Sequence, residues 1–288
     1  FDAISTLAEE SENPQRDLPK GMIYSLLICT VVYIILALVL TGMVPYDMLG
    51  VSDPLAEIFK LKGVKWMLFI VSIAAVVAMT SVLLVFQMGQ PRIWMTMSRD
   101  GLMPNRFSSI HPKYKTPGFA TIVTGFVVGV PIFFTDENFV LDFTSIGTLF
   151  AFVLVCGGIL LLPKREKVAG KFHLPYINAK YIVPAIFIIS TVLMLSYNMQ
   201  YIKSLLDVKG ENFTSNISMI LFFVLFIVMA ILSFLRNLSF IPVAGLLSCC
   251  YLLTGMAASN WIWFFIWFGI GLLVYFLYGY KNSKLNKQ

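Results

Sequence analysis

Few residues of this chain have the type and spacing of an enzyme or metal centre. The two histidines, His111 and His173, have no cysteine, aspartate or glutamate at the spacing of a metal ligand. The sequence contains no phosphate-binding glycine loop and no paired aspartates of the kind that hold a metal–pyrophosphate in membrane prenyltransferases. The four cysteines lie inside apolar runs, where we expect small buried hydrophobic residues: Cys29, Cys156, Cys249 and Cys250. We therefore expect no enzyme and no resident cofactor, which leaves binding and gating groups as candidates.

One set of candidate binding residues shares a helix face. Ser72, Ala75 and Met79 follow one another at spacings of three and four residues, which places them on one side of a helix. The same run has a second face of small residues that suits close contact between membrane helices: Ala74, Ala78 and Ser81. We assign the first face to a binding pocket and the second to packing, with packing as the alternative for both.

The first ten residues supply the other candidates. Phe1 and Ile4 stand one helical turn apart in an apolar pattern that becomes polar at Glu9 and Glu10. Asp2 lies within this pattern, and an ionisable residue inside a membrane helix indicates function by default, with a structural cap or ion pair as the alternative. Because the chain starts with phenylalanine inside a helical pattern, we expect that it begins in the middle of a helix and that an N-terminal portion is missing.

The composition predicts an integral membrane protein. Apolar residues make up 58% of the 288 residues and charged residues 12%, and the mean hydropathy is +0.83. A soluble domain carries about 25% charged residues. The net charge of +6 does not indicate nucleic-acid binding, because the basic residues lie in short loops between apolar runs. These runs predict eight spans: 20–43, 64–89, 118–134, 139–162, 181–200, 217–235, 240–258 and 261–280.

The basic residues predict the orientation. With eight spans, sixteen of the 21 lysines and arginines fall on one side of the membrane and five on the other. Loops rich in lysine and arginine stay in the cytoplasm. We therefore expect the C-terminus to be cytoplasmic, the loop at Lys164 to be inside and the loop at Asp136 to be outside.

Four segments resemble the cationic amino acid transporter family of the amino acid–polyamine–organocation superfamily. Residues 1–21, FDAISTLAEESENPQRDLPKG, resemble that family's sixth helix and the loop after it. GQPR at residues 89–92 and MSRDGLMP at 97–104 resemble the loop after the eighth helix, and IGTLFAF at 146–152 resembles part of the tenth. The closing run 261–279 is the fourth match, and the four segments occur in the family's order over nearly the whole chain.

The resemblance implies an all-α fold of the leucine-transporter type, a polytopic membrane helix bundle built from two inverted five-helix repeats. Residues 1–162 would form the second repeat, from half of helix six through helix ten, and the first five helices would be absent. Residues 163–288 would form four further transmembrane helices outside the repeat core. The two extra spans are similar to the fourteen-helix members of the family.

The resemblance also assigns roles to residues. The break in the sixth helix presents backbone N–H groups to a substrate carboxylate; Phe1 would close over the bound amino acid, and Ile4 would line the pocket. Thr80-Ser81 resembles the hydroxyl pair that holds sodium in sodium-coupled relatives.

A cytoplasmic gate is the remaining implied role. In this fold the sixth and eighth helices move as separate bodies, so Glu9 and Glu10 are expected to form ion pairs with Arg92 and Arg99 that close the inner path. The alternative is that these four charges only satisfy helix ends and the positive-inside bias.

From these observations we expect a secondary active amino acid permease for neutral or cationic amino acids, working by alternating access. Proton coupling is what the resemblance implies, and sodium-coupled symport is the alternative. A third hypothesis is a non-transporting membrane sensor or scaffold that retains the fold. The expected partners are the amino acid substrate and the lipid bilayer, without nucleic acid, in the plasma membrane or the inner membrane of a bacterium.

Overall fold

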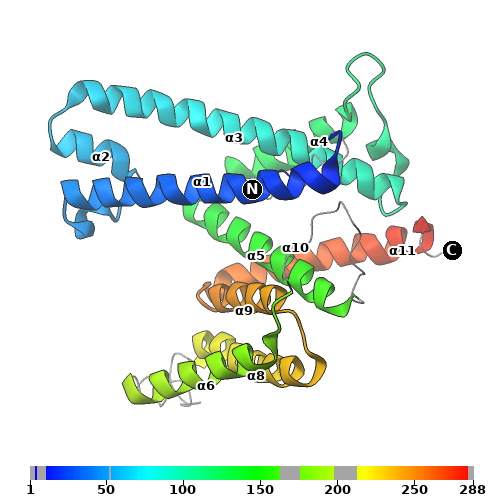
Figure 1. Cartoon of the computed structure of the whole chain (residues 1–288). Coiled ribbons are helices and arrows are strands. Elements are labelled where there is room, and N and C mark those ends of the chain that lie inside the picture. Colours follow the sequence, from blue (N-terminus) through cyan, green and yellow to red (C-terminus); the bar gives the residue numbers. More distant parts are fainter. Residues whose placement is uncertain (1–3, 5–10, 52, 163–175, 198–212, 285–288) are drawn as a thin grey trace. The chain divides into compact units, whose positions relative to one another are not determined.

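The computed structural model describes residue 4 and residues 11–51, 53–162, 176–197 and 213–284 (Figure 1). Within these ranges there is no β-strand, although an isolated bridge pairs Asn178 with Ser239. This confirms the all-α fold. The α-helices are α1 Pro14–Met43, α2 Pro54–Leu61, α3 Lys65–Arg99, α4 Gly118–Ile132, α5 Glu137–Leu161, α6 Ala179–Tyr197, α8 Phe213–Arg236, α9 Phe240–Thr254, α10 Ala258–Val274 and α11 Tyr280–Asn282. Short 3-10 helices, η2 Tyr46–Leu49 and η3 Asn105–Ser108, and a π-helix, η4 Tyr275–Gly279, join them.

A helix lies at each of the eight expected spans. Among the described residues, six helices are long and apolar enough to cross a membrane: Pro14–Met43, Lys65–Arg99, Glu137–Leu161, Ala179–Tyr197, Asn216–Arg236 and Ala258–Asn282. The apolar helices α4 and α9 have 15 residues each, which is about 22 Å at 1.5 Å per residue and less than the roughly 30 Å of a bilayer core. The chain is therefore a multi-pass membrane protein.

The start of α1 differs from the sequence prediction. The first span was expected to begin at residue 20, directly after Pro19, but the helix begins at Pro14 and continues through Pro19. Proline suits the first helical position because the N–H that it lacks has no partner there. Pro19 removes one hydrogen bond to the carbonyl of Gln15, and Gln15 is exposed, so water can satisfy that carbonyl.

The end of α3 also differs. Residues 89–104 were expected to be a loop, but α3 passes through Pro91 and ends at Arg99. Its C-terminal part is packed, and this packing stabilises the helix beyond the proline: Gly89, Pro91, Met95 and Ser98 are its buried residues. The chain then turns at Gly101, whose φ is +84°.

The described residues form two compact units. One unit extends to Val130 and resumes at Phe276, and the other lies between Pro131 and Tyr275. The expected division of the fold at residue 162 concerns the inverted repeat rather than local packing, and it stays a prediction.

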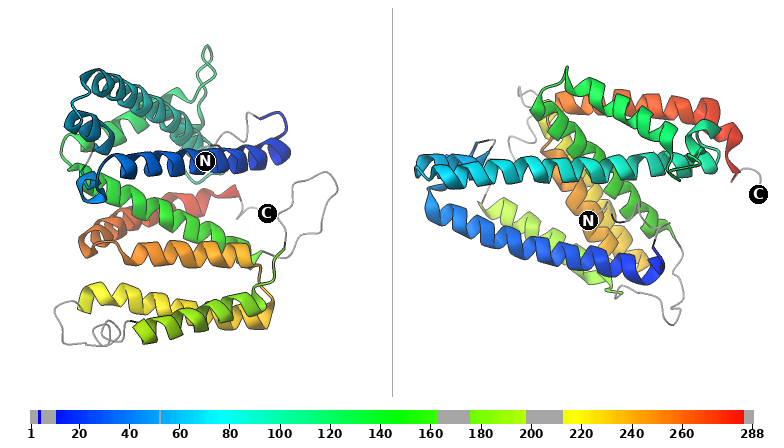
Figure 2. Two further views of the ribbon diagram at one scale, coloured as in Figure 1. Left: turned by 60° about the vertical axis from the view of Figure 1, so that its left-hand side comes forward. Right: turned by 90° about the horizontal axis from the view of Figure 1, so that it is seen from above.

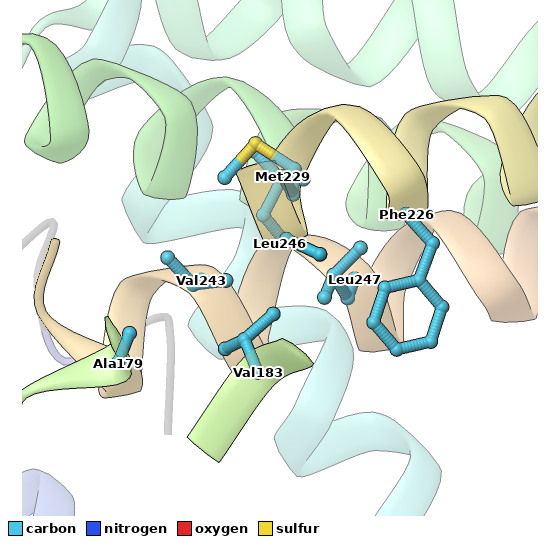
Figure 3. Close-up of a cluster of buried hydrophobic side chains, with 8 residues drawn as sticks. Ala179, Val183, Phe226, Met229, Val243, Leu246 and Leu247 are labelled. Carbon is cyan, nitrogen blue, oxygen red and sulfur yellow. The ribbon is translucent and has the colours of Figure 1, made fainter. Parts of the chain in front are cut away.

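In the unit between Pro131 and Tyr275, helices pack in pairs. α5 lies beside α9, and α6 lies beside α8 (Figure 2). Buried side chains from α6, α8 and α9 meet in one cluster (Figure 3): Ala179, Val183, Phe226, Met229, Ala230, Val243, Leu246 and Leu247. A second cluster joins α5, α9 and α10 through Ile146, Leu253 and Phe264.

Glycines let α5 and α9 approach closely. A Cβ at Gly245 of α9 would lie 2.9 Å from Sγ of Cys156, and one at Gly157 of α5 would lie 3.6 Å from Leu246. Cys156, Cys249 and Cys250 are half-buried, as expected of small hydrophobic residues in packed helices. The expectation of burial is wrong for Cys29, which is exposed on α1, a helix without buried residues.

Candidate functional site

The predicted pocket face lies in the N-terminal half of α3. Ser72 and Met79 are exposed, Met79 at 65%, and Ala75 is half-buried. The 18-residue stretch of α3 that is most apolar has no buried residue. These three residues therefore share an open helix face, as their spacing predicts, and their role in a pocket stays a prediction.

The hydroxyl pair on the same helix is bonded within α3. The Oγ1 of Thr80 donates to the carbonyl of Val76 at 2.8 Å, and the Oγ of Ser81 donates to that of Val77 at 2.9 Å. Each oxygen keeps lone pairs that can accept. Among the described residues no group of three or more His, Cys, Asp or Glu side chains gathers at metal-binding distance.

The two predicted gate arginines lie at the packed C-terminal end of α3. Arg92 is half-buried, and Arg99 is exposed. Because both lie in one continuous helix, their separation of seven residues is two turns, which brings them to one face. This common face is what a gate formed by both arginines would need, and the gate itself stays a prediction.

A series of aromatic side chains anchors this end of α3. Trp94 of α3 meets Phe107 of η3 edge to face, with ring centroids 5.4 Å apart, and Phe107 meets Phe119 of α4 at 5.1 Å. Nearby, the side-chain amide of Gln87 donates to the carbonyl of Thr121 at 2.9 Å. These contacts join the C-terminal half of α3 to η3 and, through Gln87, to α4, while α2 packs against the beginning of α3.

The remaining predicted site residues lie in the first ten residues of the chain. Ile4 is half-buried. Phe1, Asp2, Glu9 and Glu10 lie outside the described residues, so their roles stay predictions.

The structure also shows a polar pair that the spacing of residues did not predict. The side-chain amide of Asn260, at the start of α10, donates to the carboxylate of Asp142 in α5 at 2.7 Å. Asn260 is 6% exposed. A sequence signal existed, because a carboxylate and an amide both interrupt apolar helices, but nothing in the sequence shows that two helices 118 residues apart are neighbours.

A cavity of about 790 Å³ opens between α8, α9 and α10, and no described residue of the predicted site lines it. Its walls are mainly apolar, and they include Phe222, Leu253, Met256 and Trp261. It offers a place for an apolar group, and none of the described residues that line it carries an ionised side chain.

Comparisons with known proteins add what the geometry does not show. The sequence model of a family described as "Amino acid permease" matches residues 1–224. A second, described as "C-terminus of AA_permease", matches residues 238–283.

Individual relatives are similar over all or part of the chain. The branched-chain amino acid permease BcaP of Bacillus subtilis is 32% identical over the whole chain, and the methylthioribose transporter of the same organism is 31% identical. The chain spans 49% of the length of each. Cationic amino acid transporter 9, chloroplastic, of Arabidopsis thaliana is 43% identical over 58% of this chain and 29% of its own length.

Proposed function

Because the chain belongs to the amino acid permease family, we propose that it serves the transport of amino acids across a membrane by alternating access. The observation that carries this proposal is the family match over residues 1–224, which includes the open face of α3 and its packed inner end. The chain spans about half the length of the two Bacillus subtilis relatives, so the activity belongs to the complete protein and not to this chain alone. Since the family consists of transporters, we propose that the protein is not an enzyme.

The substrate class that we propose is a neutral or cationic amino acid. The relatives divide among branched-chain amino acids, cationic amino acids and methylthioribose, as their names state. In the proposed pocket, Phe1 closes over the substrate, while Asp2 and Ile4 line it together with the α3 face of Ser72, Ala75 and Met79. The side chain of Met79 suits this role, because an unbranched, flexible side chain can set the length of the substrate side chain that fits beside it.

For the inner gate, we propose ion pairs between Glu9 or Glu10 and Arg92 or Arg99. The continuous helix supports a common face for the two arginines. Exposed pairs contribute only about 0–1 kcal/mol each, but two of them acting on a balanced equilibrium can shift its populations several-fold. Glu10→Arg should bias the protein inward-open, and adding Arg92→Glu should restore uptake. A double mutant no better than the worse single mutant, with Arg99→Glu also failing to rescue, argues against the gate.

Uptake by the complete protein in proteoliposomes tests the proposal. Radiolabelled leucine, arginine and methylthioribose are offered in parallel under a proton gradient, with and without a protonophore, and with sodium replaced by choline. Uptake of an amino acid that the protonophore abolishes supports the proton coupling that the family resemblance implies, whereas dependence on sodium favours the sodium-coupled alternative. Methylthioribose uptake alone excludes amino acid transport, and binding without uptake favours a sensor or scaffold.

For the location we propose the plasma membrane, or the inner membrane of a bacterium, with the C-terminus in the cytoplasm. The distribution of basic residues supports this orientation. An introduced cysteine at residue 165 should resist an impermeant reagent in intact cells, and one at Asp136 should react.

A further inference from the structure

The turn after α3 is a closed structure that depends on glycine. Gly101, with a φ of +84°, has a left-handed conformation that other residues rarely adopt. Its N–H donates to the carbonyl of Ser98 at 3.1 Å, and the N–H of Leu102 donates to that of Met97 at 2.9 Å, which is the Schellman pattern of a helix end. The hydroxyl of Ser98, a residue only 2% exposed, donates to the carbonyl of Pro104 at 2.7 Å and closes the turn.

Residues 282–284, here called the closing segment, lie directly against this turn. A Cβ at Gly101 would overlap the carbonyl oxygen of Asn282 and lie 3.0 Å from its carbonyl carbon. The N–H of Lys284 donates to the carbonyl of Asp100 at 3.1 Å. Ser283, which lies between Asn282 and Lys284 in the chain, is 7% exposed. Both stretches belong to the same compact unit. The contact is therefore backbone against backbone, and it requires the space that a glycine leaves.

We propose that the closing segment positions the inner end of α3. Asp100 accepts the hydrogen bond from this segment and directly follows Arg99, so docking of the segment fixes where the last turn of α3 ends. The last carbonyls of a helix have no partners within it, so such an end frays unless other groups hold it. The inference rests on the proposed function in one respect, because the inner end of α3 carries the gate arginines.

A purely local role for Gly101 in ending the helix is the alternative, and the chain contains a matched control. Gly63 follows α2 with a φ of +71°. Its N–H donates to the carbonyl of Lys60 at 3.1 Å, and that of Val64 donates to Phe59 at 3.0 Å, the same pattern as at Gly101. A Cβ at Gly63 would meet no atom within 4 Å. Gly63→Ala therefore carries the conformational strain of alanine without the overlap.

A second pair of variants isolates the hydrogen bond. Lys284→Pro removes the N–H that donates to Asp100, and Lys284→Ala keeps it. Proline is compatible with the preceding residue, because Ser283 has φ −56° and ψ 130°, the extended conformation that a residue before proline prefers.

The experiment measures the order of the turn independently of transport. The complete protein, with its other cysteines replaced and Ser98→Cys introduced, is labelled with a maleimide in detergent. Gly101→Ala and Lys284→Pro should raise the labelling rate about tenfold or more, because local opening exposes a buried group. Gly63→Ala and Lys284→Ala should leave the rate within about twofold of the parent.

Uptake by the same variants, without the cysteine, completes the test. Loss of protection at residue 98 together with lower uptake supports the proposal. Equal labelling in Gly101→Ala and Gly63→Ala, or protection that survives Lys284→Pro, overturns it, and lost protection with unchanged uptake overturns the link to the gate. If the parent protein transports nothing, the proposed function fails, while labelling still decides whether the closing segment positions α3.

Discussion

Replacing Gly245 by alanine should destabilise the pair of α5 and α9 through a single contact. The new Cβ would lie 2.9 Å from Sγ of Cys156, which is too close for carbon and sulfur without displacement. Overpacking of a core costs about 1–3 kcal/mol, whereas replacing glycine by alanine inside a helix gains up to about 1 kcal/mol. We therefore expect a net loss of about 1 kcal/mol, which lowers the Tm by about 2–4 °C for a chain of this size.

The partner residue allows the reasoning to be tested by a change of sign. Cys156→Ala removes the sulfur that the new methyl group meets. In that background Gly245→Ala should no longer destabilise the protein, and it should raise the Tm by the helix-propensity gain. The expected coupling between the two substitutions is about 1–2 kcal/mol, within the range seen for residues in contact.

The assay is thermal unfolding of the four purified proteins of this cycle in detergent, followed by intrinsic fluorescence. Gly147→Ala is the control for propensity alone, because it is a helical glycine of α5 whose added Cβ would meet no atom within 4 Å. If Gly245→Ala shifts the Tm equally in both backgrounds, the contact with Cys156 does not cause the change in Tm, and α5 and α9 do not pack closely at this point.

Three further predictions concern the site and its support. Phe1→Ala should weaken the apparent substrate affinity at least about tenfold, since a buried aromatic lid contributes on the order of 2 kcal/mol. The control Phe126→Ala, at a residue 68% exposed, should leave the affinity unchanged. Equal effects of the two substitutions in competition uptake would exclude the lid. Met79→Ser should admit larger or cationic amino acids, and an unchanged ranking of competitors would place Met79 among the packing residues. Asn260→Leu leaves the carboxylate of Asp142 without this donor and should cost about 1.5–3 kcal/mol; a thermal midpoint equal to that of the parent in detergent would show that the pair adds no stability.

The positions of the helices were predictable because apolar runs of about twenty residues have few alternatives to a membrane helix. Their ends were less so. Pro19 and Pro91 indicate helix ends in the sequence, but both lie inside helices. Pro19 lies in the first turns of α1, and Pro91 lies in a packed part of α3. In both places the helix continues despite the lost hydrogen bond. Surroundings of this kind are set by the fold and do not show in the local sequence.

The candidate site was predictable only in part. The spacing of Ser72, Ala75 and Met79 showed that they share a face, and the helix confirms it. Because α3 is apolar on all sides, its pattern does not show which face meets another helix and which meets a pocket. The contacts of Gly101 and Asn260 join residues far apart in the chain, so the sequence alone does not show them.

The proline within α3 has a mechanical consequence. Pro91 has no N–H, so the carbonyl of Gln87 loses its usual partner and the bending stiffness of the helix falls at this level. Before this flexure lies the stretch with the predicted pocket face, which Gln87 joins to Thr121 of α4, and after it lies the stretch that Trp94 and Phe107 join to η3 and α4. The stretch before Pro91 can bend relative to the stretch after it more easily than in an unbroken helix. A rigid rod of the same length would transmit every tilt to the turn at Gly101.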